Sequence, residues 1–298
     1  NSTIISSGTR TDYTDYTNSN WKVGNEVPLA ALVIGNRTPG SYKYETTVTL
    51  NNVKLETGEK AIRKAMYVYQ ESDDYPVTVL GSLSTDSERT INVIDGKENK
   101  AIVFPEAKIG DKYYNKLADA VLAAQQATNE DNKVVDVLKD KITVGTHSIE
   151  INGSVIINGN GADFYQVDEE QDVSVFAYNN NKGVVSKEQN VNIIINNAKN
   201  LRVWGNGSLI ADNQKVKISL NDCSWDLSSK GFKNVDNIGM IMLRGANGNG
   251  SYQLEMNNCN IENTSKTDAI HGNILSKVLI NKCTFGNTAR PINISHDL

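Results

Sequence analysis

Several features that often reveal a function are scarce in this chain of 298 residues. There is no run of lysine or arginine and the formal net charge is -5, so the basic stripe that nucleic-acid phosphates require is missing. No apolar stretch reaches 18 residues and no signal-peptide core is present, so we expect neither a membrane span nor an export signal within the chain. Aromatic residues make up only 7%, which suits thin layers with a narrow interior.

What the chain does contain is a repeated phrase of the form apolar-x-apolar-Asn-x-small-x-apolar. Each copy is a short strand with period-2 alternation, a polar pair led by asparagine, and a second short strand. Asparagine readily adopts a left-handed backbone conformation, so a repeated asparagine predicts a repeated corner. The leading residues Asn51, Asn221, Asn257 and Asn281 are therefore expected to form a structural ladder. The copies are Val48–Leu55, Ile218–Trp225, Leu254–Ile261 and Val278–Phe285, with looser forms at Ile149–Ser154 and Ile193–Ala198.

The spacing of the small residues supports stacked coils. Cys259 and Cys283 are 24 positions apart (283 minus 259), and Cys223 and Cys259 are 36 apart (259 minus 223). The first interval matches one coil of a parallel β-solenoid, and the second matches one coil plus a loop containing Gly245–Ser251. We expect Cys223, Cys259 and Cys283 to form an inward column of small apolar side chains. A metal site or a disulfide is the weaker interpretation, because the count is odd and no Cys-x-x-Cys pair exists.

The fold class predicted from these patterns is all-β, a parallel solenoid whose most regular part is the second half, where 26 of the 38 asparagines follow residue 150. Residues 1–104 form a β-rich region that we interpret as terminal coils of a β-helix. A small β-sandwich is the alternative, because several short strands at such spacing suit it equally well. The expected strands there are Leu29–Ile34, Thr46–Leu55, Ala65–Tyr69, Val77–Leu80 and Ile91–Ile94, with a turn at Asp73–Pro76.

A single helix is expected at about 115–128. Asn115 is the expected N-cap, and the apolar positions recur at helical spacing at Leu117, Ala120, Val121 and Ala124. The open end of a solenoid needs a cover against edge-to-edge pairing, and a short amphipathic helix provides one. We therefore place a boundary near residue 105, with a capping helix followed by coils over 105–298.

The segment from Ala107 to Ala124, followed by Val134–Asp140 and Ile142–Val144, resembles a repeat of large surface and secreted proteins of Gram-positive bacteria, especially gut Firmicutes. In that family an Ile-Gly, Tyr, Leu-x-x-Ala pattern forms a capping helix that precedes right-handed, pectate-lyase-like β-helix coils. The family's Gly-Asp before the next strand is replaced here by Asp131-Asn132. The resemblance covers about residues 107–161 and implies a right-handed β-helix in a cell-surface protein.

Parallel β-helices also host polysaccharide lyases and glycoside hydrolases, so an enzyme is the alternative function. Hydrolysis needs two carboxyl groups that flank the bond, and a lyase needs a base with a group that neutralises the uronate. Asp268 and His271 are the catalytic candidates under this alternative. Of the pectinase signatures, only Lys266–Asp268 and Ala269–Gly272 survive as fragments, and Arg290-Pro291 is a partial match to a pectate-lyase motif. Asp222 and Asp226 are further acidic candidates.

Binding candidates outside that set are few. Trp204 is the expected sugar-stacking residue, whereas Trp225 falls on an apolar position of its phrase and is expected in the core. Asn158–Asp163 is a single degenerate copy of a calcium-roll motif and is interpreted as a turn. Asp168–Asp172 lacks the Asp-x-Asp-x-Asp-Gly pattern of a calcium loop. The three histidines are scattered, so no cofactor is expected and loosely bound calcium is the one cation left open.

The leading hypothesis is therefore a non-catalytic module of an extracellular or cell-surface bacterial protein, acting as a stalk or adhesin. Its expected partners are glycans or host surface proteins, and nucleic acid is not among them. Asp297-Leu298 directly follows an alternating stretch, which predicts that the chain is part of a longer protein.

Overall fold

The chain divides into two compact units, residues 1–105 and residues 106–298, each with its own hydrophobic core. The computed structural model describes residues 2–6, 30–36, 44–57, 64–70, 73–85, 100–144, 148–166, 175–178, 188–206, 210, 213–226, 241–244, 250–262, 268–288 and 290–294. The expected strand at Ile91–Ile94 and the expected loop at 245–249 lie outside these residues. Within the described part, no helix is long and apolar enough to cross a membrane.

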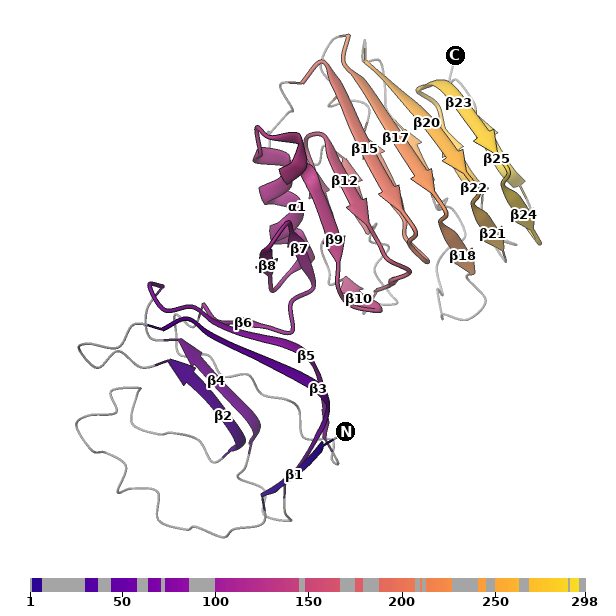
Figure 1. Cartoon of the computed structure of the whole chain (residues 1–298). Helices are drawn as coiled ribbons and strands as arrows, with labels where there is room; N and C mark the ends of the chain where they lie inside the picture. The colour runs from indigo at the N-terminus through magenta and orange to yellow at the C-terminus, as the bar shows by residue number, and fades with distance from the viewer. Residues whose placement is uncertain are drawn as a thin grey trace. The chain divides into compact units, whose positions relative to one another are not determined.

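The first unit contains two sheets, and its first five strands alternate between them (Figure 1). All the pairings described within it are parallel. Side chains from both sheets, among them Leu55, Met66 and Val79, meet in its core. The four-stranded sheet holds β1 (Ser2–Ser6), β3 (Thr46–Thr57), β5 (Val77–Thr85) and β6 (Ile102–Val103), and the two-stranded sheet holds β2 (Ala30–Asn36) and β4 (Lys64–Gln70).

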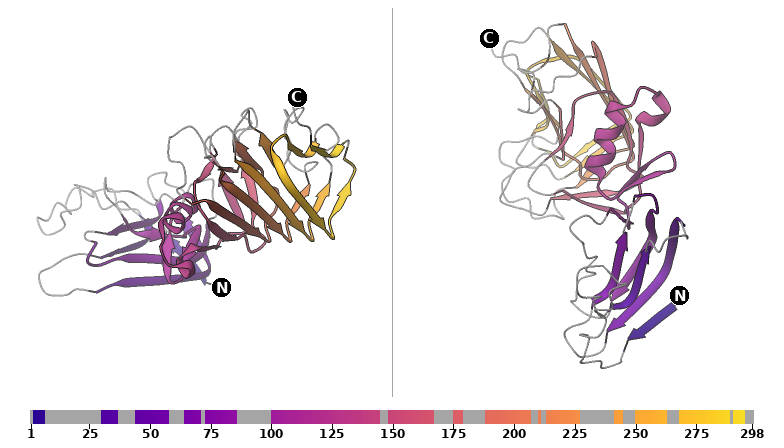
Figure 2. Two further views of the ribbon diagram at one scale, coloured as in Figure 1. Left: turned by 90° about the horizontal axis from the view of Figure 1, so that it is seen from above. Right: turned by 90° about the vertical axis from the view of Figure 1, so that its left-hand side faces the viewer.

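The second unit is built from three rows of parallel strands, which we name the first, second and third sheets. Apart from an antiparallel hairpin at its start, the first sheet contains six strands, which run side by side in Figure 1. The chain passes through the second and third sheets before it returns to the first. Figure 2 shows the resulting stack from two further directions. The strands of the first sheet are β9 (Val134–Val137), β12 (Val155–Asn158), β15 (Asn190–Asn196), β17 (Lys215–Asn221), β20 (Ser251–Asn257) and β23 (Leu275–Asn281).

The other two sheets complete each circuit, which we call a coil. In the second sheet, isolated bridges through Lys199 connect β13 to β18, so this residue serves as the strand of its coil. The second sheet holds β10 (Lys141–Val144), β13 (Asp163–Gln166), β18 (Ser224–Asp226), β21 (Asn260–Glu262) and β24 (Thr284–Gly286). The third holds β11 (Ile149–Ile151), β14 (Phe176–Tyr178), β16 (Val203–Asn206), β19 (Ile241–Arg244), β22 (Asp268–Gly272) and β25 (Arg290–Ile294).

The alternation read from the sequence determines which side chains enter the core. In β20 the apolar residues Tyr252, Leu254 and Met256 are buried, and the polar residues between them are partly exposed. The same inward positions of β17 hold Val216, Ile218 and Leu220, in register with those of β20. Because the strands are parallel and in register, like residues stack on like residues and form continuous apolar columns along the unit. The all-β prediction is therefore confirmed, together with parallel sheets.

The expected helix is present as α1 (Leu117–Gln126), and the four residues predicted to face the core are buried. It contacts β7 (Ala107–Ile109), β8 (Lys112–Tyr114), β9, β11 and β12, which lie at the start of the stack. A short 3-10 helix (Glu130–Lys133) follows it. The prediction of Asn115 as N-cap was wrong: Lys116 is at that position, and the Leu117 N–H donates to Glu106 Oε2 at 2.9 Å.

The corner residues also differ from the prediction by one position. The leading residues Asn221, Asn257 and Asn281 are the last residues of β17, β20 and β23. The left-handed conformation belongs to the next residue in each case, namely Asp222 (φ 56), Asn258 (φ 53) and Lys282 (φ 55). Asn51 and Asn52 show the same division in the first unit, since only Asn52 has a positive φ (52). The leading asparagine therefore keeps the extended conformation of its strand, and its side chain can bond to the equivalent residue of the neighbouring coil.

Candidate functional site

A ladder of amide hydrogen bonds follows the end of the first sheet. Each later side chain donates from its amide nitrogen to the oxygen of the preceding one, and the four bonds are each 2.9 Å long. Such a ladder satisfies the amide groups within the protein and holds the coils in register. Its members are Asp136, Asn158, Asn196, Asn221 and Asn257.

The ladder therefore also includes earlier coils, in which the sequence contains no exact copy of the repeated phrase. Asn196 belongs to the looser copy Ile193–Ala198, whereas Asn158 lies in no copy and was expected only as the start of a turn. Asn281 is paired in register with Asn257, on the strand at the end of the sheet. Asn51 is exposed on β3 of the first unit.

The acidic candidates Asp222 and Asp226 take part in similar bonding between coils. Asn258 donates to Asp222 Oδ1 at 2.6 Å, and the Asp226 N–H donates to Asn200 Oδ1 at 2.9 Å. Asn200 in turn donates to Asp163 Oδ1 at 2.9 Å. Both candidates are exposed. Asp222 lies at a corner and Asp226 on β18 of the second sheet, whereas Asp268 lies on β22 of the third sheet.

The three cysteines form a column beside the ladder. The Cys223 and Cys259 side chains are buried and Cys283 is partly exposed, and all three thiols are free. Each Sγ lies 3.4–3.6 Å from a backbone carbonyl of the preceding coil: Cys223 from Ile195, Cys259 from Leu220 and Cys283 from Met256. Among the described residues, no group of three histidine, cysteine or acidic side chains is arranged to hold a metal ion.

The two tryptophans that the structure describes differ in environment. Trp225 is 1% exposed, and its indole nitrogen donates to the Leu201 carbonyl. Trp204, the expected sugar-stacking residue, lies on β16 and is only partly exposed. A partly covered ring offers less area for stacking than an open aromatic platform.

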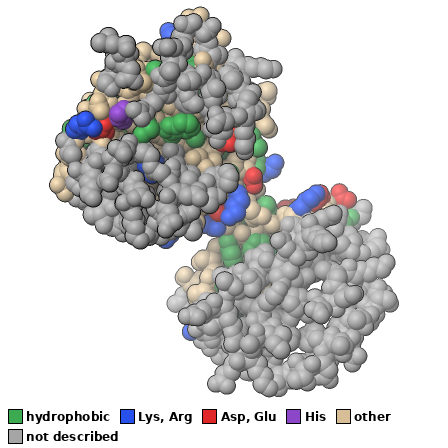
Figure 3. Space-filling view, turned by 180° about the vertical axis from the view of Figure 1, so that it is seen from behind, with side chains coloured by type: hydrophobic (Ala, Val, Ile, Leu, Met, Phe, Trp, Pro, Cys, Tyr) green, Lys and Arg blue, Asp and Glu red, His purple; other side chains and the backbone are tan. Residues whose placement is uncertain are grey.

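One cluster of charged side chains gathers around Asp268 in the third sheet. The Asp268 side chain is only 5% exposed, and it accepts from Arg290 Nε at 2.6 Å and from Asn293 Nδ2 at 2.8 Å. His271 Nδ1 lies 2.8 Å from Asp268 Oδ2. Arg290 and Asn293 come from β25, which is paired with β22 in register. Figure 3 shows acidic, basic and histidine side chains gathered together at one edge of the molecule.

Hydrogen bonding dominates the electrostatics of this carboxylate. Burial by itself would raise the pKa of Asp268, but the bonds from Asn293, His271 and Arg290 favour the ionised form and lower the pKa below its ordinary value. Asp268 is therefore a charged group held in place by three partners.

The sequence brought Asp268, His271 and Arg290 under consideration, and the structure places all three together. Asn293 was missed, because the pairing of β22 with β25 cannot be read from local pattern. Within the described residues, no second carboxylate joins the cluster. Hydrolysis by a carboxylate pair therefore has only one of its two groups here. Lys266, His147, His296, Asp168–Asp172 and Trp21 lie outside the described residues.

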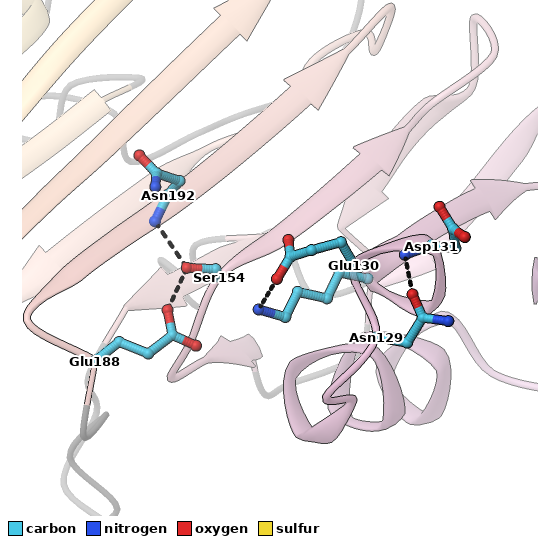
Figure 4. Close-up of polar contacts among 7 residues, drawn as sticks. Asn129, Glu130, Asp131, Ser154, Glu188 and Asn192 are labelled. Atoms are coloured by element: carbon cyan, nitrogen blue, oxygen red, sulfur yellow. Dashed lines mark hydrogen bonds and ion pairs between the residues drawn. The ribbon is translucent and has the colours of Figure 1, made fainter.

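A second polar group lies near the start of the stack (Figure 4). The Ser154 hydroxyl donates to Glu188 Oε2, and the Asn192 N–H donates to Ser154 Oγ at 3.0 Å. These bonds connect β12, β15 and the segment that enters β15. These contacts were not predicted, because Glu188 and Asn192 are 34 and 38 residues away from Ser154 in the sequence.

The same view shows the residues around the 3-10 helix (Figure 4). Lys133 donates to Glu130 at 2.8 Å, and this hydrogen bond raises the pKa of the lysine. Asn129 Oδ1 accepts from the Asp131 N–H at 3.0 Å and caps the helix. These contacts stabilise the link between α1 and the first coil.

The interior of the coils contains a pair of tyrosines that the sequence analysis did not identify, besides the edge-to-face pair of Phe164 and Phe176. The rings of Tyr178 and Tyr252 meet edge to face with centroids 6.0 Å apart, and both are almost fully buried. The Tyr178 hydroxyl donates to Gln214 Oε1 at 3.3 Å. Burial raises the pKa of both phenols, so they remain neutral. Gly205 lies against Tyr252, where a Cβ would come within 2.6 Å of the ring and hydroxyl atoms.

Comparisons of this chain with protein-family models, with curated proteins and with solved structures find no match.

Proposed function

We propose that the chain is a right-handed parallel β-helix that serves as a non-catalytic, extracellular module of a bacterial surface protein. The parallel sheets, the repeated return of the chain to each sheet and the stacked asparagines support the β-helix. The resemblance of residues 107–161 to coils of Gram-positive surface proteins supports the right-handed sense and the location. The module would act as a stalk or adhesin.

The first unit fits the same proposal. Its described strands pair only in parallel, and β1 to β5 alternate between two sheets. Sandwich strands joined by hairpins pair antiparallel, so this pairing favours terminal coils over the small sandwich.

The observation that carries the proposal is the way polar side chains are used. At successive corners, amide and carboxylate groups bond to the equivalent group of the neighbouring coil. Groups used in this way stabilise a long stack, and they are not arranged around a substrate. Binding of glycans or host surface proteins would then depend on an extended face of the coils, with Trp204 as the aromatic candidate.

The enzyme alternative is supported by the cluster at Asp268. If His271 donates to Asp268 from Nδ1, its Nε2 is the basic nitrogen, and Arg290 lies beside it as a cationic partner. A base next to a cation is the minimum that elimination from an acidic sugar needs. Among the residues that the structure describes, the cluster has no second carboxylate of the kind a hydrolase needs, so a lyase is the form of this alternative to test.

A panel of plant, mucin and bacterial-wall glycans separates the two functions. Binding and product formation are measured with the purified chain, with and without calcium, and in the variants Asp268→Asn and His271→Ala. The module hypothesis predicts no product under any condition. Turnover that disappears in both variants, while circular dichroism shows both to be fully folded at the assay temperature, would establish the enzyme instead. Weaker glycan binding in Trp204→Ala would identify the binding face.

A further inference from the structure

The cysteine column has a composition that packing alone does not explain. The backbone N–H of Lys199 donates to the carbonyl of Ala162 and that of Ser224 donates to the carbonyl of Ala198, both at 2.8–3.0 Å. Asn260 and Thr284 bond in the same way to Cys223 and Cys259. The equivalent position therefore holds alanine in two coils and cysteine in the next three. Since alanine fills this position with 1% exposure, the space does not require a thiol.

The alignment of neighbouring cysteines meets the backbone requirement of a disulfide. The Thr284 N–H donates to the Cys259 carbonyl at 2.9 Å, which places Cys283 directly beside Cys259 on the next coil. Neighbouring strands lie about 4.8 Å apart, within the roughly 4.4–6.8 Å between Cα atoms that a disulfide spans. Both side chains leave their strands in the same direction, because Ile261 and Phe285, two positions later, are also aligned.

Exposure distinguishes the two neighbouring pairs. Cys223 and Cys259 are 1% and 2% exposed, whereas Cys283 is partly exposed on the coil at the end of all three sheets. A dissolved oxidant therefore reaches Cys283 first. The thiol of Cys259 is its neighbour in the column, and β23, β24 and β25 of the coil that holds Cys283 each pair with a described strand on one side only.

We propose that Cys259 and Cys283 form a disulfide that cross-links the last two coils when the protein meets a small-molecule disulfide. The Cys283 thiolate attacks the reagent, forming a mixed disulfide and releasing one reduced thiol. The Cys259 thiolate then attacks the Cys283 sulfur and displaces the second. The two protein thiols lose two electrons and two protons, which the reagent takes up as it becomes two thiols.

The environment of the two thiols sets the rate of this reaction. Burial raises the pKa of Cys283, and the hydrogen bond with Cys223 together with burial raises the pKa of Cys259. Because the thiolate is the attacking species, cross-linking should be slow at pH 7 and several-fold faster at pH 9. This inference is independent of the proposed function, since it concerns the chain alone.

The test is oxidation of the purified chain with oxidised glutathione, followed by non-reducing peptide mapping by mass spectrometry. We expect a monomer in which the Cys259 and Cys283 peptides are linked. The loop closed is 24 residues long (283 minus 259), so the melting temperature of the second unit should rise by roughly 5 °C or more on oxidation.

Alanine variants provide matched controls, because alanine is present at the same position in Ala198. Cys223→Ala should retain both the linked peptides and the rise in melting temperature. Cys259→Ala and Cys283→Ala should lose both, and Cys259→Ala should stop at a glutathione adduct on Cys283. A Cys223–Cys259 link, a disulfide between two copies through Cys283, or a stable adduct on Cys283 in the parent chain would each overturn the proposal.

Discussion

Two adjacent residues at each corner of the second unit have different roles, although both are often asparagine. Asn257 is extended at the end of β20 and donates to Asn221 in the ladder, whereas Asn258 is left-handed with a φ of 53. Glycine tolerates a left-handed position and alanine does not, but alanine is the better of the two in a strand.

Substitution should therefore give opposite orders of stability at these two positions. At Asn258 the glycine variant should be more stable than the alanine variant by about 1 kcal/mol. At Asn257 the alanine variant should be the more stable by about 0.5–1 kcal/mol, with both below the parent chain because the ladder bond is lost. Urea denaturation of the four variants measures the order. The same order at both positions would contradict the division of roles.

A second residue-scale prediction concerns Asp268 and pH. The folded-state pKa of this group lies below the ordinary value of 3.8, so the ionised form stabilises the folded state. That stabilisation is complete above the unfolded pKa and is lost as the pH falls through the folded pKa. The melting temperature of the parent chain should exceed that of Asp268→Asn at pH 5, and the difference should shrink progressively below pH 3.8. A constant difference down to pH 2 would show that the charge of Asp268 is not responsible.

At the scale of elements, the helix α1 depends on a cap that lies far away in sequence. Glu106 is 8% exposed and accepts the Leu117 N–H at 2.9 Å, and Lys116 donates to its other oxygen at 3.0 Å. A carboxylate at a helix N-terminus satisfies an unpaired N–H and interacts favourably with the helix dipole. The hairpin of β7 and β8 brings this carboxylate back to the helix, so the cap and the antiparallel hairpin act together.

Two substitutions of Glu106 should lower the free energy of unfolding by different amounts. Glu106→Gln keeps an oxygen that can accept the Leu117 N–H, whereas Glu106→Ala leaves the group without a partner. We expect the alanine variant to lose about 1–2 kcal/mol and the glutamine variant clearly less. Thermal unfolding followed by circular dichroism compares them. Equal losses in both variants would mean that the negative charge of Glu106, and not its hydrogen bond, provides the stabilisation.

Element by element, the sequence predicted what depends on local periodicity. The buried stripe of α1 and the alternation in β17, β20 and β23 were predictable, because spacing alone decides which side chains face inward. The cap on α1 was not, since Glu106 precedes Leu117 by 11 residues. In the third sheet, only β11 falls within a copy of the phrase, the looser one at Ile149–Ser154. The other strands of that sheet were not predicted, because they are short and carry no repeated phrase. The cluster at Asp268 could be named only in part for the same reason: Asn293 comes from another strand of that sheet.

At the scale of the whole second unit, the two ends of the stack differ. The helix α1 and the β7–β8 hairpin cover the first coils, whereas β23, β24 and β25 are the terminal strands of the three sheets. Ile270 on β22 is fully buried, but Ile292, its register partner on β25, is 41% exposed. Inward-facing side chains of the last described coil thus have a neighbour on one side only.

The core should therefore weaken toward that end, and a matched pair of variants tests this. Ile270→Ala removes buried methyl groups between two coils and should cost about 2–5 kcal/mol. Ile292→Ala removes the same atoms from a site that is already open on one side, so its cost should be about 1 kcal/mol. Urea denaturation at low protein concentration gives both values. Equal losses in free energy of unfolding would show that the last described coil is covered in solution. A smaller loss for Ile292→Ala that grows with protein concentration would identify a second copy of the chain as the cover.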